Sequence, residues 1–267
     1  MTGGNNMFTI SMSCFEYDDF MKLADHAGIL AKKGIGVELC ADSLPFFNAG
    51  MYKSLLPGIH LGMHCPMRGI DIAAPRGSAG ERFFWIKYED TLKLCQQLQA
   101  SYMVVHTLHK VHKVGKAEAL ELSFERLQKL IKLATDYGVE IWIENVGTYL
   151  KGTILYEEEE FIELAESLPD ALFLVDVGHA YQNGWDAMKV CRRLGSKLRG
   201  LHVHDNFGVT DLHLRIGSGS FPLKEFVYGI PNKDINFVME YLPTTCDSVK
   251  AILDDIEVMN EYLKASE

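Results

Sequence analysis

The stretch LFLVDVGHAYQNGWD, residues 172–186, begins as an apolar run typical of a buried strand. The run ends on Asp176, and His179 follows three residues later. A carboxylate and an imidazole at the end of a core strand are costly to bury unless they are paired or bind a cation. The stretch therefore predicts a buried strand that brings polar side chains to a functional site.

Seven further apolar or β-branched runs share this pattern, at residues 7–14, 34–40, 59–66, 102–109, 139–147, 198–205 and 235–243. Amphipathic stretches of about 10 to 20 residues separate most of them, which is typical of strands and helices alternating around a parallel sheet. The clearest helices are predicted at residues 80–100, 117–138 and 246–265. The connection at residues 41–58 is the weakest helix, because Pro45 and Gly50 interrupt it.

Eight strand–helix units in 267 residues match the size of a TIM barrel. No linker or low-complexity tract divides the chain, so we predict an α/β fold, a (β/α)8 TIM barrel, as a single domain over residues 1–267. A doubly wound open sheet is the alternative. It would need a glycine-rich phosphate turn after the first strand, and residues 11–20, SMSCFEYDDF, contain none.

Composition argues against several classes of protein. No apolar stretch approaches the roughly 20 residues that span a bilayer, and the N-terminus lacks a secretory signal, so we expect a cytoplasmic protein without a membrane partner. The net charge of -10 disfavours binding along a phosphate backbone, so no nucleic-acid partner is expected. The six cysteines form no Cys-x-x-Cys pair, which argues against a disulfide framework and a thiolate zinc site.

Polar residues gather where the predicted strands end, which is where TIM barrels carry their active sites. These residues are Glu38, His64, His106, Glu144, Asp176, His179, His202, His204, Asp205 and Glu240, and the loop at 211–219 adds Asp211, His213 and Arg215. Each one alone fits a hydrogen-bonded core residue or a salt-bridge partner. Together on one rim they would be costly to bury without a compensating cation. The pattern therefore predicts a divalent metal ion.

Imidazole and carboxylate ligands without thiolate suit Mn²⁺, Co²⁺, Mg²⁺ or Zn²⁺ and do not decide among them. His202 and His204 lie on the same side of their strand at different depths, and only one of them needs to contact the metal. His109, Lys110, His112 and Lys113 are interpreted as solvated loop residues.

The motifs MHCP, VVHTLH, WIENVG, VDVGHAY, RGLHVHDN, DLHLRIGSG and VMEY, in this order at the strand ends, resemble the xylose isomerase-like TIM barrels. That superfamily includes sugar and sugar-phosphate isomerases and epimerases, inosose dehydratases and the endonuclease IV enzymes. The likeness extends from about the second strand to the eighth. It implies a central divalent metal ion held by Glu144, Asp176, His202 and Glu240.

The resemblance also implies roles for other residues. His179 is similar to the residue that contacts the substrate in ketose 3-epimerases and holds a further metal in the nuclease. The positions where the nuclease would place further metal ligands are His64, His106, His179, Asp211 and His213. The substrate-binding residues that we expect in an epimerase are His64, His106, His179, Glu38 and Arg215.

Three segments depart from the nuclease pattern. HCPMRGIDIAA replaces a loop bearing Tyr and Asn, HTLH replaces His-Pro-Gly, and HVHDNFG replaces His-x-Asn-Asp followed by basic residues. These changes remove parts that would contact DNA. The segment HVHDNFGVTDLHLRIGSG resembles the sugar-isomerase branch better.

We therefore expect a divalent-metal-dependent isomerase or epimerase that acts on a sugar, sugar phosphate or related polyol ketone through an enediolate. Glu144 and Glu240 are the predicted catalytic residues, one removing a proton and the other returning it. The alternatives are an endonuclease IV-like multi-zinc phosphodiesterase, an inosose dehydratase-type lyase, and a sugar-binding barrel without turnover. The expected partner is a small carbohydrate, and a homo-oligomer is left open.

Overall fold

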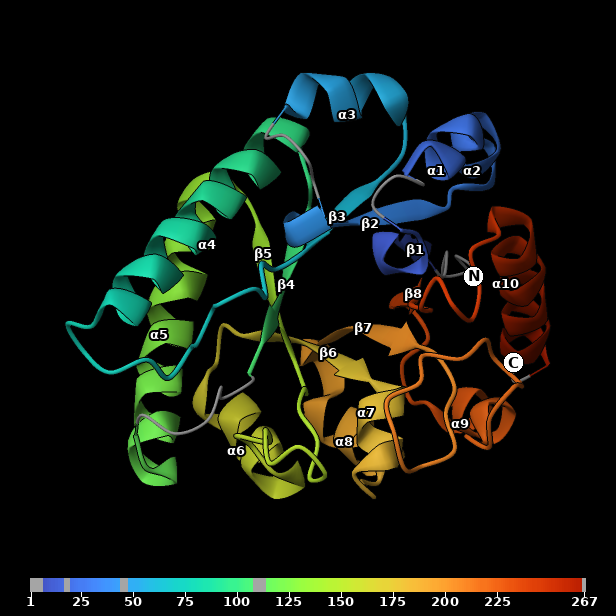
Figure 1. Ribbon diagram of the computed structural model, residues 1–267. Coiled ribbons are helices and arrows are strands. Elements are labelled where there is room, and N and C mark those ends of the chain that lie inside the picture. The colour runs from blue at the N-terminus through green and yellow to red at the C-terminus, as the bar shows by residue number, and fades with distance from the viewer. Residues whose placement is uncertain (1–6, 17–19, 44–47, 108–113, 266–267) are drawn as a thin grey trace.

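The eight strands form a closed parallel barrel in chain order, with β1 hydrogen-bonded to β8 (Figure 1). The computed structural model describes residues 7–16, 20–43, 48–107 and 114–265. The strands are β1 (Met7–Ser11), β2 (Gly36–Cys40), β3 (Leu61–His64), β4 (Tyr102–His106), β5 (Glu140–Glu144), β6 (Leu172–Asp176), β7 (Leu198–Val203) and β8 (Asn236–Met239). The predicted TIM barrel is confirmed, and closure excludes the open sheet.

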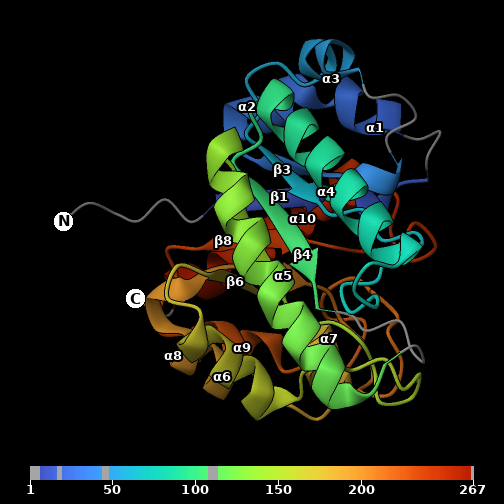
Figure 2. The ribbon, with the colours of Figure 1, turned by 90° about the vertical axis from the view of Figure 1, so that its left-hand side faces the viewer.

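Helices surround the barrel on its outside (Figures 1 and 2). They are α1 (Phe20–Asp25), α2 (Ala27–Lys33), α3 (Ala49–Leu55), α4 (Ala79–Leu98), α5 (Lys116–Tyr137), α6 (Glu158–Ser167), α7 (Val177–Gln182), α8 (Ala187–Leu194), α9 (Leu223–Gly229) and α10 (Val249–Lys264). Short 3-10 turns are η1 (Met12–Cys14), η3 (Ala41–Ser43) and η4 (Gly195–Lys197). No helix in the described part of the chain has the length and apolar character needed to cross a membrane.

The three clearest predicted helices correspond to α4, α5 and α10, which are also the three longest described helices. The region predicted to be the weakest helix contains η3 and the seven-residue α3. The sequence predicts that Gly50 interrupts a helix here. Instead, Gly50 lies in the first turn of α3. The side chain of Asn48 accepts a hydrogen bond from Met51 N there, so a cap stabilises the start of the helix.

Strand alternation determines which side chains face the site. In β6, Phe173 and Val175 belong to the large core that packs under the helices, whereas Leu174 belongs to a separate cluster with Trp142 of β5. Successive side chains of a strand point to opposite faces. Asp176 therefore points the same way as Leu174, into the barrel, at the end where the strand stops.

The same rule places the polar ends of the neighbouring strands. Glu144 follows Trp142 by two residues, and His106 follows Val104 by two residues, and both apolar residues belong to the inner cluster. The inner apolar cluster thus forms a floor, and the polar strand ends form the layer above it.

The junction of β6 and α7 explains the Asp-x-x-His spacing. Asp176 ends the strand and is also the N-cap of α7, where its Oδ1 accepts a hydrogen bond from His179 N at 2.7 Å. Capping satisfies a backbone donor that the first turn would otherwise leave unpaired. The cap therefore fixes the backbone of His179 beside the carboxylate of Asp176.

Candidate active site

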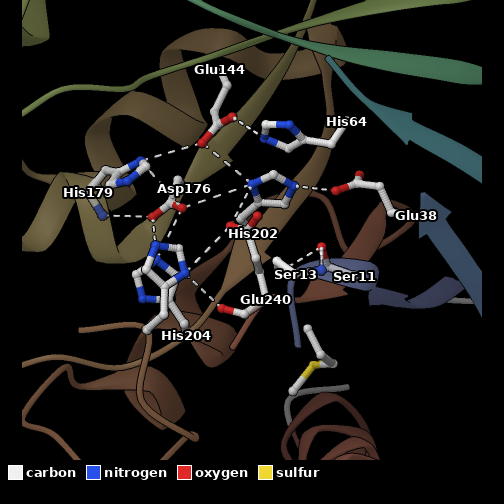
Figure 3. A network of polar contacts seen from close by, with 12 residues as sticks. Ser11, Ser13, Glu38, His64, Glu144, Asp176, His179, His202, His204 and Glu240 are labelled. Carbon is white, nitrogen blue, oxygen red and sulfur yellow. Dashed lines mark hydrogen bonds and ion pairs between the residues drawn. The ribbon is translucent and has the colours of Figure 1, made fainter. Parts of the chain in front are cut away.

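The polar strand ends meet around a cavity of about 370 Å³ at the C-terminal end of the barrel. Seven of the predicted site residues line it: His64, His106, Glu144, His179, Asp211, His213 and Glu240. Asp176 and His202 are buried and directly contact these residues (Figure 3). The cavity is within the size range of small-molecule sites.

His202 lies at the centre of a buried carboxylate cluster (Figure 3). Its Nδ1 is 3.1 Å from Glu240 Oε2, 3.4 Å from Glu144 Oε1 and 3.9 Å from Asp176 Oδ2. This nitrogen has no hydrogen-bond partner. Three carboxylates and one imidazole nitrogen thus converge from β5, β6, β7 and the end of β8, a donor set that suits a hard or borderline divalent cation.

The other edge of the His202 ring is held from below. Its Nε2 lies 3.1 Å from Glu38 Oε1, and Tyr102 donates its hydroxyl proton to Glu38 Oε2 at 3.0 Å. Asn236 in turn donates to the Tyr102 hydroxyl at 3.2 Å. A carboxylate on one nitrogen of an imidazole fixes the ring and its tautomer, so that the other nitrogen is free to bind a metal.

Glu38 was expected to contact the substrate, but it does not line the cavity. It is fully buried beneath His202, and its two carboxylate oxygens contact His202 and Tyr102. The reason is its position in the strand. β2 ends at Cys40, which does line the cavity, and Glu38 lies two residues deeper on the same face.

A second group of ligand-type atoms lies beside the central one. His64 Nε2 and His106 Nε2 are 2.9 Å apart, and both approach Glu144 Oε2, at 3.8 Å and 3.0 Å. His64 Nδ1 lies 3.1 Å from the carbonyl oxygen of Cys65, which can only accept, so this nitrogen carries the proton. Its Nε2 is then the acceptor in the contact with His106 Nε2 and faces Glu144.

A third group lies on the other side of the central one. Asp211 Oδ2 is 3.2 Å from His179 Nε2, and Asp211 Oδ1 is 3.2 Å from His213 Nε2. His179 Nδ1 is also 3.4 Å from Glu144 Oε1, which connects this group to the central carboxylates. The backbone of His213 has a left-handed φ of 43°, held in part by a hydrogen bond from Leu242 N to its carbonyl oxygen.

His204 is a site residue for which the sequence predicts no separate role. Its Nε2 lies 3.0 Å from Asp176 Oδ1, and its ring stacks on that of His213 with centroids 3.8 Å apart. The close packing depends on Gly178, where a Cβ atom would lie 2.0 Å from the His204 ring. The strand alternation that puts His204 on the face of His202 was the signal for this contact.

Arg215 was expected to bind substrate, but it does not line the cavity. Its Nη2 and Nε form an ion pair with Asp255 of α10 at 2.7 Å and 3.0 Å. Because Asp255 is buried, the guanidinium of Arg215 balances its charge and does not face the cavity. The four loop residues His109, Lys110, His112 and Lys113 lie outside the described residues.

Electrostatics indicates that the cluster requires positive charge. Burial raises the pKa of Glu240 to about 7, with Glu144 and Asp176 adding to the effect against His202 and His213. Burial lowers the pKa of His202, but Glu240, Glu38 and Glu144 outweigh it, so that this pKa lies well above its ordinary value. Without a metal, a proton on His202 therefore neutralises part of the carboxylate charge.

The family model of the xylose isomerase-like TIM barrels matches residues 52–262. The chain belongs to this family. The matched region contains the described candidate ligands of all three groups, and Glu38 lies before it.

The chain is also similar to proteins of known sequence and structure. An uncharacterised protein of Methanocaldococcus jannaschii is 24% identical over 253 residues, covering 93% of this chain and 97% of that protein. Fructoselysine 3-epimerase of Escherichia coli O157:H7 is 25% identical over 140 residues, covering 52% of this chain and 51% of that enzyme. A solved structure of a D-tagatose 3-epimerase-like protein matches with a TM-score of 0.78 and 21% identity over 97% of both chains.

Proposed function

We propose that the protein is a divalent-metal-dependent epimerase or isomerase of a sugar, sugar phosphate or related polyol ketone. The observation that carries the proposal is the buried Nδ1 of His202, which has no hydrogen-bond partner and faces Glu144, Asp176 and Glu240. Burying three carboxylates around one imidazole is unfavourable unless a cation compensates their charge.

The donor set fits a metal, because oxygen and imidazole nitrogen are ligands of Mn²⁺, Co²⁺, Mg²⁺ and Zn²⁺ alike. Glu144, Asp176, His202 and Glu240 would hold it, with Glu38 orienting the imidazole from the opposite edge. A bound divalent cation would stabilise negative charge on a carbonyl oxygen and so make the neighbouring C–H more acidic.

Proton transfer is assigned to two carboxylates that line the cavity. Glu144 comes from the end of β5 and Glu240 directly follows β8, so they reach the cavity from well-separated strands of the barrel. If one removes the proton from a planar intermediate and the other returns it to the opposite face, the carbon is inverted. Return of the proton to the adjacent carbon gives isomerisation instead.

The relatives support this chemistry over other uses of the barrel. One curated relative is named as a 3-epimerase of fructoselysine, and one solved structure as a D-tagatose 3-epimerase-like protein. We extend to this chain the reaction class that these names share. The substrate we infer is a small carbohydrate with a carbonyl group next to a hydroxyl-bearing carbon.

The test is product analysis with metal-loaded protein. The Mn²⁺-loaded chain is incubated with a panel of ketohexoses and their 6-phosphates, and new stereoisomers are detected by chromatography and NMR. Glu144→Gln and Glu240→Gln should each lower turnover by about 10² to 10⁴ while the circular dichroism spectrum is unchanged. Glu163→Gln, on the exposed surface of α6, is the matched control and should leave turnover intact. Normal turnover in both active-site variants would overturn the assignment.

A multi-metal phosphodiesterase is the second candidate. The observation that favours it is the pair of additional ligand groups, His64 with His106 and His179 with Asp211 and His213, on either side of Glu144. Two or three metal ions in a row are one way to stabilise the attacking and leaving oxygens of a phosphodiester. The zinc-loaded chain would then cut a duplex with an abasic site, and failure to cut it would remove this candidate.

Adding an inosose to the same panel tells a lyase and a non-catalytic sugar-binding protein apart. Loss of water from an inosose would identify the dehydratase chemistry, which needs the same carbonyl activation with a hydroxyl as the leaving group. Metal-dependent binding of a ketose without any product would instead indicate a binding protein.

A further inference from the structure

The outer part of the cavity differs in character from its floor. The floor carries buried groups such as Glu144 and His64, which suit a metal ion and the oxygens of a polyol. Met67 and Leu242 line the same cavity but are each 38% exposed, so they lie at its mouth. A substrate that reaches the floor therefore has its far end beside apolar side chains and solvent.

Lys151 also lines this mouth. Among the described residues around the cavity it is the one lysine, and no arginine lines it. The side chain is exposed, and its ammonium group makes no hydrogen bond or ion pair within the described part of the chain. The acidic groups of the cavity instead pair with histidines, as Asp211 does with His179 and His213. The cation at the mouth is thus available to a ligand.

The turn that carries Lys151 is closed by its own hydrogen bonds. Lys151 N donates to Thr148 Oγ1 at 3.1 Å, Thr148 N donates to Thr153 Oγ1 at 3.0 Å, and Thr153 N donates to Thr148 O at 3.1 Å. Gly147 enters the turn with a φ of 101°, and a Cβ there would lie 2.6 Å from Thr153 O. This backbone is accessible to glycine and strained for other residues. The backbone of Lys151 is therefore held in place by the hydrogen bonds of this turn.

The turn is also fastened to the element that carries His179. Tyr149 N donates to Asn183 Oδ1 at 3.2 Å, and Asn183 Nδ2 donates to Gly147 O at 2.9 Å. Asn183 directly follows α7. Because α7 contains His179, the lysine-bearing turn and the wall of the metal cluster are joined by side-chain hydrogen bonds.

We propose that Lys151 binds an anionic group, a phosphate or a carboxylate, at the end of the substrate remote from the metal cluster. The inference rests on the proposed function and narrows its substrate class to anionic ketoses. A neutral sugar would leave the ammonium group in solvent. An anionic substituent would form charge-assisted hydrogen bonds with it, which are stronger than those between neutral groups. The apolar mouth suits the carbon chain that joins the two ends of such a substrate.

Calorimetric binding to the Mn²⁺-loaded full chain tests the subsite. The ligands are D-fructose, D-fructose 6-phosphate, D-fructuronate and inorganic phosphate. Lys151→Met should weaken binding of the anionic ketose by about tenfold and leave D-fructose within about twofold of the original affinity. Lys151→Arg should retain most of the affinity. Whichever of the two anionic ketoses loses more affinity in Lys151→Met identifies phosphate or carboxylate as the natural group.

The matched control is Lys132→Met, which removes the same charge from an exposed position on α5 that does not line the cavity. It should bind every ligand as the original chain does. Equal affinities of Lys151→Met and the original chain for both anionic ketoses would overturn the subsite without affecting the proposed function. If no ketose binds, the proposed function fails. The binding of inorganic phosphate then tests the subsite by itself: equal phosphate affinity of Lys151→Met and the original chain would overturn the subsite as well.

Discussion

His202 has a different task at each edge of its ring. Glu38 holds Nε2 at 3.1 Å from below, and the carboxylates of Glu144 and Glu240 face Nδ1 from above. A histidine that ligates a metal commonly has its second nitrogen bonded to a carboxylate in this way, which fixes the tautomer. The chemistry of the site therefore depends on the residue beneath the imidazole as well as on the three acids above it.

Metal binding should release protons at neutral pH. The pKa of His202 lies well above its ordinary value and that of Glu240 is about 7, so at pH 7 the metal-free site is wholly or partly protonated at both groups. A cation must displace those protons, and metal affinity should rise with pH until both groups are deprotonated. Each proton released corresponds to about a tenfold gain in affinity per pH unit.

The measurement is calorimetry of Mn²⁺ binding at pH 7 in two buffers with different ionisation enthalpies. The observed enthalpy should differ between the buffers in proportion to the protons released. Identical enthalpies, together with an affinity that does not change between pH 6 and pH 8, would contradict this account of the cluster.

At the scale of elements, two connections hold the site together: the loop between β7 and α9, and the junction of β6 with α7. Asp205 anchors the loop by accepting hydrogen bonds from Gly219 N at 2.8 Å and Phe221 N at 3.0 Å. Arg215 then ties the same loop to Asp255 of α10. The loop carries Asp211 and His213, so these contacts keep the third ligand group in place.

Arg215→Met should destabilise the fold. It removes the ion-pair partner of Asp255, a buried carboxylate that then keeps, within the described part of the chain, only the Tyr241 hydroxyl at 3.0 Å as a side-chain donor. Leaving a buried acceptor underpaired costs about 1–3 kcal/mol of unfolding free energy. Urea denaturation measures this loss. A raised KM with unchanged stability would restore Arg215 as a substrate-binding residue.

Gly178→Ala tests the packing at the start of α7. The new methyl group would fall 2.0 Å from the His204 ring, so His204 must move away from Asp176. We expect weaker binding of Mn²⁺, since loss of a residue that supports a ligand typically costs 10- to 100-fold in metal affinity. The control is Gly28→Ala in α2, where a Cβ meets no atom within 4 Å and metal affinity should not change. Unchanged affinity in Gly178→Ala would show that His204 does not support Asp176.

At the scale of the whole molecule, the barrel was predictable because its signal is periodic. Eight apolar runs alternating with amphipathic stretches bury their surfaces in a parallel sheet covered by helices, and eight such units match the size of the closed barrel that is found. The convergence of Glu144, Asp176, His202 and Glu240 followed from that closure, because the ends of all parallel strands meet on one rim.

Depth and pairing were not predictable from the same pattern. Glu38 and His64 both belong to strand-end runs, but Glu38 stands two residues before the end of β2 and is therefore buried below the cavity. The sequence position of Arg215 predicts a cation at the rim of the barrel. Its ion-pair partner Asp255 could not be predicted, because it lies 40 residues away in the chain. Strand periodicity gives the face of a side chain, whereas register and contacts between distant elements decide what it touches.

The number of metal ions per chain distinguishes a single-metal epimerase site from a multi-zinc site. Elemental analysis of the purified protein, after dialysis against metal-free buffer, counts the ions that remain bound. We predict about one divalent ion per chain, which is lost in His202→Ala, because three carboxylates converge on the buried Nδ1 of His202 at the centre of the cluster. Two or three zinc ions per chain, or one ion that persists in His202→Ala, would contradict this prediction.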